Sequence, residues 1–212
     1  MSAGLATASA DLDRADCLAI RLLSLESIAA ARRVGDFMLI VPRDAAARTL
    51  RRHGKDALVA QWRESLGEEA LSPVLHWRIL EALPAAGSDA ERRALLPIRG
   101  PLLGEIVRPA PDTLRCDLRV PFDLDVFAGH FASIPIVPAV LQVGWAVDLL
   151  RSHLHADARF AGLASAKFRR VMHPGMALTL ALTRDGDRAQ FEYVSGESLV
   201  STGRLLFEAG HG

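Results

Sequence analysis

The chain has 212 residues, of which 50% are hydrophobic and 24% charged, a composition typical of a soluble globular protein with one large or two small domains. Its 25 basic residues balance 25 acidic ones, so no net charge draws it toward nucleic acid or an anionic membrane. Cys17 and Cys116 are too few for a disulfide framework or a metal site, and we expect no metal.

Residues 1–15 consist mostly of small and polar residues without a periodic apolar face, which predicts a disordered tail. They lack a basic stretch followed by an apolar one, so we expect no secretory signal. No apolar run approaches the roughly 20 residues that span a bilayer. A cytoplasmic protein without a membrane span is therefore the expectation.

Residues 16–96 predict a small α/β domain. The expected elements are a strand at Phe37–Val41, helices at Ala45–Arg52 and Ala57–Leu66 around a break at Gly54, and a strand at Val74–Leu80. Cys17–Ile28 is apolar, but its pattern does not separate helix from strand. Ala85–Ala94, small and then charged, is the best candidate for a linker to the second half.

Residues 99–212 change to alternating apolar and polar positions, a pattern typical of half-buried strands. Asp185-Gly186-Asp187 is a hairpin-turn signal. The expected elements are strands at Leu103–Val107 and Leu114–Val120, a buried helix at Val137–Leu154, and strands at Phe160–Val171, Ala177–Thr183, Ala189–Val194 and Leu199–Phe207. This order predicts an α+β domain with an antiparallel sheet wrapped around one helix.

The stretch Gly129-His130-Phe131 followed by Pro135-Ile136-Val137-Pro138-Ala139-Val140-Leu141 resembles the G-H-F-x-x-x-P-I-x-P-G-V-L signature of 3-hydroxyacyl-(acyl carrier protein) dehydratases. Further likeness, to dehydratase-like domains of aryl-polyene pigment pathways, lies in Gln142–Ala146, Lys167-Phe168, His173-Pro174-Gly175 and Ser201–Leu205. The resemblance implies a hotdog fold, a bent antiparallel sheet around a central helix, preceded here by the small α/β domain.

Dehydration of a 3-hydroxyacyl thioester needs a base for the α-proton, an acid for the β-hydroxyl and dipoles at the thioester carbonyl. The resemblance implies that His130 is the base and that helix N–H groups near Ala139 bind the carbonyl oxygen. The other residues expected beside the substrate are Phe131, Pro138, Val140, Gln142 and Gly144. For Gln142, a hydrogen bond to a neighbouring backbone group is the alternative. No cofactor is expected, and the partner is an acyl carrier protein with its acyl-phosphopantetheine.

Two positions depart from the family pattern. The acidic residue of the family stands fourteen residues after the histidine, where this chain has Gly144, which has no side chain to donate a proton. Asp148, one helical turn later, is the candidate substitute acid. Ala139 replaces a glycine, so its methyl group lies where the family leaves space for the thioester or for a positive φ.

Three functions remain open. The first is a dehydratase of fatty-acid or polyene pigment biosynthesis. The second is a non-catalytic hotdog subunit that supports an active dehydratase, and the third is an acyl thioesterase. In hotdog dimers of the resembled family the base and the acid meet across the subunit interface. An open sheet edge also favours pairing, so we expect a homodimer or a heterodimer with another hotdog protein.

Leu39–Leu95 is similar, more faintly, to the small C-terminal subdomain of adenylate-forming acyl ligases. In that family a Leu-Pro pair precedes a turn with a lysine that contacts the acyl-adenylate. Here Leu83-Pro84 is followed by Ala85–Ala90, which contains no lysine, and the chain has no glycine-rich phosphate loop. We therefore expect a domain without ligase activity, retained for packing or docking.

Overall fold

The computed structural model describes residues 17–67, 76–129, 133–154 and 159–208. The predicted disordered tail, residues 1–15, lies outside the described residues. Contacts between residues divide the chain into two compact units. The first unit comprises Met1–Arg99 with Phe122–Pro135, and the second comprises Gly100–Pro121 with Ile136–Gly212.

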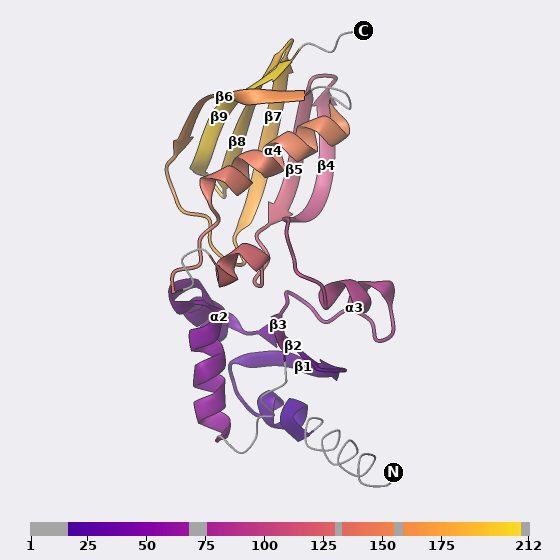
Figure 1. Ribbon diagram of the computed structural model, residues 1–212, viewed down its shortest axis with the longest axis vertical. Coiled ribbons are helices and arrows are strands. Elements are labelled where there is room, and N and C mark those ends of the chain that lie inside the picture. Colours follow the sequence, from indigo (N-terminus) through magenta and orange to yellow (C-terminus); the bar gives the residue numbers. More distant parts are fainter. Residues whose placement is uncertain (1–16, 68–75, 130–132, 155–158, 209–212) are drawn as a thin grey trace. The chain divides into compact units, whose positions relative to one another are not determined.

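The second unit is a six-stranded sheet in which every neighbouring pair is antiparallel, in the order β4-β5-β7-β8-β9-β6. The strands are β4 (Leu102–Ala110), β5 (Thr113–Arg119), β6 (Arg159–Phe168), β7 (Ala177–Asp185), β8 (Arg188–Ser195) and β9 (Ser198–Glu208). Helix α4 (Ala139–His153) lies across one face of this sheet (Figure 1). The predicted α+β hotdog fold is confirmed.

Alternation along the strands places one set of side chains beneath α4. In β5 the residues Leu114, Cys116 and Leu118 are buried, whereas the residues between them are exposed. The helix contributes buried apolar residues over most of its length, which explains its weak amphipathic pattern: Trp145, Ala146, Val147, Leu149 and Leu150. Burial raises the pKa of the Cys116 thiol, and the Asp117 carboxylate adds to this shift.

The first unit contains a three-stranded sheet of β1 (Ile28–Val34), β2 (Phe37–Pro42) and β3 (His76–Ile79), with β1–β2 antiparallel and β2–β3 parallel. Helix α2 (Asp44–Leu66) connects β2 to β3, as a crossover between parallel strands requires. It contains the predicted break, because Gly54 has a φ of 81°. Residues 17–23 are helical, which resolves the ambiguous apolar segment into a helix followed by β1.

The stretch predicted as a linker contains a short helix, α3 (Asp89–Ala94). The Ser88 hydroxyl accepts the Glu91 N–H at 3.1 Å, and the Glu91 carboxylate accepts the Gly87 N–H at 2.8 Å. Glu91 also pairs with Arg32 of β1 at 2.7 Å. The Ser-x-x-Glu sequence at residues 88–91 is typical of a helix start, and it was the sequence signal for a helix that composition alone did not show.

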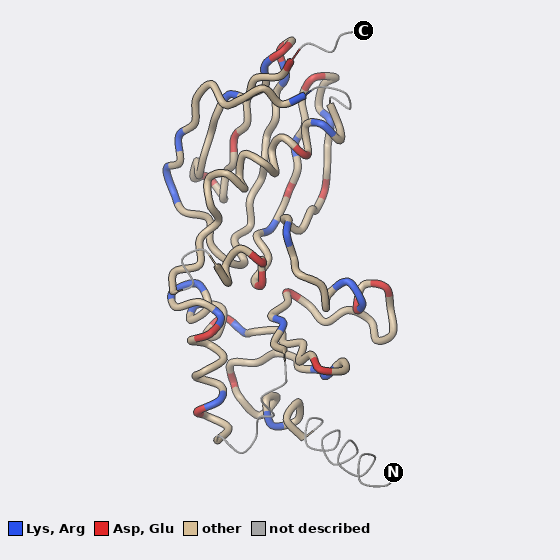
Figure 2. The backbone as a smooth tube through the Cα atoms, in the orientation of Figure 1, with Lys and Arg blue, Asp and Glu red and all other residues tan. Residues whose placement is uncertain are grey.

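Charged residues of both signs are interspersed along both units (Figure 2), as expected from the balanced composition. Within the ranges that the structure describes, no helix combines the length and the apolarity needed to cross a membrane.

Gly203 in β9 is required by close packing. A Cβ atom there would lie 2.5 Å from the Phe191 ring and 2.7 Å from the Ser165 carbonyl oxygen. We predict that Gly203→Ala lowers the free energy of unfolding by about 1–3 kcal/mol, measured by urea denaturation. The matched control is Gly162→Ala in β6, where a Cβ meets nothing within 4 Å and the change stays within about 0.5 kcal/mol. Equal effects of the two substitutions would contradict this packing.

Candidate functional site

The first turn of α4 presents two backbone N–H groups without intrahelical acceptors. The N–H groups of Leu141 and Gln142 both bond the Pro138 carbonyl oxygen, at 3.1 and 3.3 Å. The N–H groups of Ala139 and Val140 lie before the first of these bonds, and the Pro138 side chain does not cap them. Both residues are exposed, with Val140 at 74%. This helix start is therefore open to an oxygen acceptor such as a thioester carbonyl.

Ala139 is the first residue of α4, so its backbone is helical and does not need glycine. Of the other predicted site residues, His130 and Phe131 lie outside the described residues. The residues predicted to bind the carbonyl oxygen, Gly144 and Asp148 therefore lie on or beside one helix, α4, and the predicted base lies outside the described residues.

The Gln142 side chain is buried beneath the helix, at 3% exposure. Its Nε2 donates to the Val137 carbonyl oxygen at 3.2 Å, and its Oε1 accepts from the Ser201 hydroxyl of β9 at 2.8 Å. The hydrogen-bonding role that the sequence left open is thus present. A direct contact of Gln142 with substrate stays a prediction.

Tyr193 of β8 holds the same turn from the sheet side. Its hydroxyl donates to the Gln142 carbonyl oxygen at 2.8 Å, and its ring packs edge-on against Phe191 at 5.9 Å between centroids. Burial raises the pKa of the Tyr193 phenol well above its usual range, with smaller contributions from Cys116 and Asp148. The phenol therefore stays protonated and remains a donor.

Gly144 lies next to open space, because a Cβ built on it meets nothing within 4 Å outside the helix's own backbone. Asp148, one turn further along α4, is exposed, and Ser152 bonds its carbonyl oxygen at 2.7 Å. Trp145 is buried in the core, at 5% exposure. The helix thus has room for an acidic side chain at position 144 and carries none there.

The segment that leads to the histidine is held by charges that the sequence analysis missed. Asp123, 8% exposed, accepts from Lys55 at 2.7 and 3.0 Å and from Arg78 at 3.4 Å. The Phe122 N–H donates to a carboxylate oxygen of Glu81 at 2.8 Å. These partners lie 41 to 68 positions apart in the chain, so no local pattern pointed to them. They hold residues 122 and 123, a few positions before Gly129, within the first unit.

Tyr193 is the chain's single tyrosine, so tyrosinate absorbance reports on this residue alone. A raised pKa in the folded protein means that stability from the protonated phenol is present below its unfolded pKa of about 10 and is lost as the pH rises above it. We predict that tyrosinate absorbance appears only together with the loss of the circular dichroism signal. Ionisation near pH 10 with the dichroism unchanged would contradict the buried hydrogen bond.

Comparisons with known proteins cover about half of the chain. The protein-family model of ApeI-like proteins, described as ApeI dehydratase, matches residues 107–204. The 3-hydroxyacyl-(acyl-carrier-protein) dehydratase FabZ of Oenococcus oeni is 33% identical over 135 residues, covering 55% of this chain and 95% of the relative. That of Lactobacillus helveticus is 30% identical over 122 residues, covering 52% and 82%.

Among solved structures, the chain is similar to one in the dehydratase heterocomplex ApeI:P from Xenorhabdus doucetiae. The TM-score is 0.49 and the sequence identity 25%, and the match covers 51% of this chain and 98% of that chain.

Proposed function

The chain belongs to the hotdog family of 3-hydroxyacyl-(acyl-carrier-protein) dehydratases, and from this membership we propose that it binds 3-hydroxyacyl or polyenoyl thioesters of acyl carrier protein in fatty-acid or polyene pigment biosynthesis. The observation that carries the proposal is the start of α4, where Ala139 and Val140 are exposed residues whose N–H groups have no intrahelical acceptor. Two adjacent donors at a helix N-terminus suit an oxygen that gains negative charge.

In the proposed reaction His130 removes a proton from the carbon next to the thioester carbonyl. The charge that develops on the carbonyl oxygen is stabilised by the N–H groups of Ala139 and Val140. The β-hydroxyl then leaves as water once an acid protonates it, which gives a 2-enoyl thioester. Phe131 and Pro138 border the acyl chain. No step requires a cofactor.

Helix α4 has a glycine at position 144, so the acid of the proposed reaction must come from elsewhere. Two proposals follow. In the first, the chain is a dehydratase that takes its acid from Asp148 or from a partner subunit. In the second, the chain is a non-catalytic subunit that binds and supports an active dehydratase. The exposed position of Asp148, one turn beyond Gly144, favours a carboxylate from the partner over the substitute acid on the same helix.

A dimer is part of both proposals. In the described part of the chain, β4 and β6 are the outer strands of the sheet, and each exposes apolar side chains. On β4 these are Leu102, Leu103 and Val107, and on β6 Leu163 and Phe168, all between 39 and 51% exposed. Such edges invite pairing with another sheet.

Three further expectations stay predictions. The first is the division into a tail at 1–15, an α/β domain at 16–96 and a hotdog domain at 99–212. The others are the likeness of the α/β domain to an acyl-ligase subdomain and the cytoplasmic location.

A substitution that restores the acid tests the site directly. We predict that Gly144→Asp or Gly144→Glu raises the rate of 2-enoyl thioester formation from 3-hydroxyacyl carrier protein by about 10²-fold or more, because general acid catalysis contributes on this scale. The change should be tolerated, since position 144 has room and replacing a mid-helix glycine improves helix propensity. Combination with Ala139→Gly tests whether the extra methyl group hinders the thioester.

Gly144→Asn is the matched control, because it has the shape of Asp without the acid, and it should stay at the parent rate. The gain should also vanish when His130→Ala is added to Gly144→Asp. If the repaired variants fold and bind acyl carrier protein but dehydrate nothing, the proposed site is misplaced. If Asp148→Asn abolishes the activity of the parent protein, the catalytic acid is Asp148. Hydrolysis of the thioester to a free carboxylic acid would identify a thioesterase.

The subunit proposals separate in a mixing experiment. We predict that the parent protein alone dehydrates 3-hydroxyacyl carrier protein slowly. When it is mixed with a cognate dehydratase that supplies the carboxylate, we predict that the dehydration rate of the mixture rises. Turnover by the isolated protein that disappears in His130→Ala would contradict the non-catalytic proposal.

The dimer is tested by sedimentation. At micromolar concentration we predict a dimer, either of this chain or with the cognate dehydratase. A monomer under both conditions would contradict the proposed pairing through the sheet edges.

A further inference from the structure

A buried carboxylate anchors the segment that leads to His130. Asp123, 8% exposed, accepts from Lys55 Nζ at 2.7 and 3.0 Å and from the Arg78 guanidinium at 3.4 Å. Lys55 follows the break in α2 at Gly54, and Arg78 lies in β3. Two elements of the first unit therefore hold one side chain, a few residues before the proposed base.

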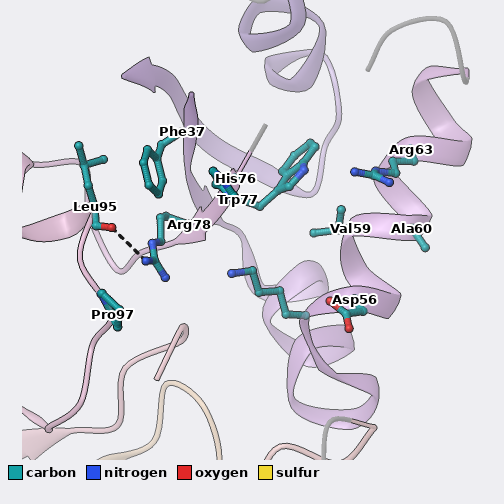
Figure 3. A pocket seen from close by; sticks show the side chains of 11 residues that line it. Phe37, Asp56, Val59, Ala60, Arg63, His76, Trp77, Arg78, Leu95 and Pro97 are labelled. Atoms are coloured by element: carbon teal, nitrogen blue, oxygen red, sulfur yellow. Dashed lines mark hydrogen bonds between the residues drawn. The ribbon is translucent and has the colours of Figure 1, made fainter. Parts of the chain in front are cut away.

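Arg78 is itself fixed by two further contacts. Its guanidinium donates to the Leu95 carbonyl oxygen at 3.0 Å, the dashed line in Figure 3, and lies 5.7 Å from the centroid of the Phe37 ring. The Arg78 side chain is 16% exposed. A guanidinium that is already held in one place loses little conformational freedom when it binds a carboxylate. It is therefore suited to fix the position of Asp123.

The residues that follow Asp123 also contact the first unit. The backbone N–H of Asp125 donates to the Ile98 carbonyl oxygen at 2.7 Å. Phe127 is buried, and together with Pro135 and with Leu50 of α2 it lines one cavity of about 160 Å³. The chain therefore lies against the first unit both before and after the proposed base.

The anchoring side chains lie outside the region that the family model matches. That region, residues 107–204, includes Asp123 but not Lys55 or Arg78. Glu81, which accepts the N–H of the residue before Asp123 at 2.8 Å, also lies outside it. The first unit thus supplies contacts to this segment that the matched region does not contain by itself.

We propose that the first unit positions the base His130. Lys55 and Arg78 are positioning residues, which act through the carboxylate of Asp123 and touch no substrate themselves. This inference rests on the proposed function, in which His130 removes the proton next to the thioester carbonyl. A base must lie within hydrogen-bond reach of the proton that it removes, so a displaced segment slows the reaction even where the fold persists.

The test follows the histidine imidazole signals of the full chain in nuclear magnetic resonance spectra. His130→Ala assigns the signal of His130 among the seven histidines. Lys55→Met removes the cation and keeps most of the side-chain length. We predict that it shifts the His130 signal toward the position of a histidine in an unfolded peptide, because a segment that loses its anchor samples more conformations. Lys55→Arg, which keeps the cation, should leave the signal close to that of the parent.

Arg32→Met is the matched control. The Arg32–Glu91 pair lies in the same unit at the same distance of 2.7 Å, and its side chains are 30 and 11% exposed, against 31 and 9% for the Lys55 pair. It involves no residue of the segment 122–135. We predict that Arg32→Met leaves the His130 signal unchanged, although it removes an ion pair of matching geometry.

A kinetic readout separates positioning from folding. In the Gly144→Asp background, Lys55→Met should lower the kcat of dehydration by about tenfold or more and leave the KM nearly unchanged, because a misplaced base still faces a bound substrate. The inference is overturned if Lys55→Met leaves the His130 signal or the kcat of an active protein unchanged, or if Arg32→Met shifts the signal equally. A shifted signal without turnover in any variant would support the anchoring and overturn the dehydratase proposal instead.

Discussion

Three buried polar side chains determine where α4 begins, and the candidate site depends on that position. Gln142 joins the backbone of Val137 to Ser201 of β9, while Tyr193 of β8 binds the carbonyl oxygen of Gln142. Apolar packing alone would let a helix slide along the sheet, since dispersion and burial have little directionality. These hydrogen bonds fix the helix in one register, and with it the first-turn N–H groups that have no intrahelical acceptor.

The same anchoring defines what the site lacks. Because the register of α4 is fixed, position 144 lies a little more than one helical turn after Ala139 and Val140, next to open space. The glycine at position 144 leaves unfilled space beside the helix. Glycine has a different role at position 203, where the Phe191 ring and a backbone oxygen occupy the place of a side chain. One glycine is thus imposed by packing, whereas the other lies next to open space.

The strand and helix pattern was readable from the sequence wherever one face is buried, as in Leu114, Cys116 and Leu118. Interactions between residues that are distant along the chain were not readable from the sequence. The shared use of Asp123 by Lys55 and Arg78 joins positions more than 40 residues apart, and nothing local indicates it. The helix at Asp89–Ala94 could have been found from the N-cap Ser88 and the glutamate three residues later. The candidate site residues on α4 came from a resemblance, whereas only the structure shows that Gln142 bonds the backbone of Val137 and Ser201 inside the fold.

The most direct test of the account is a crystal structure of the protein with a 3-hydroxyacyl-pantetheine mimic that carries a stable amide in place of the thioester. The account predicts that the carbonyl oxygen of the mimic accepts hydrogen bonds from the N–H groups of Ala139 and Val140, and that the β-hydroxyl lies near Gly144 and the imidazole of His130. A mimic bound elsewhere, or a carbonyl oxygen that contacts neither N–H group, would contradict it.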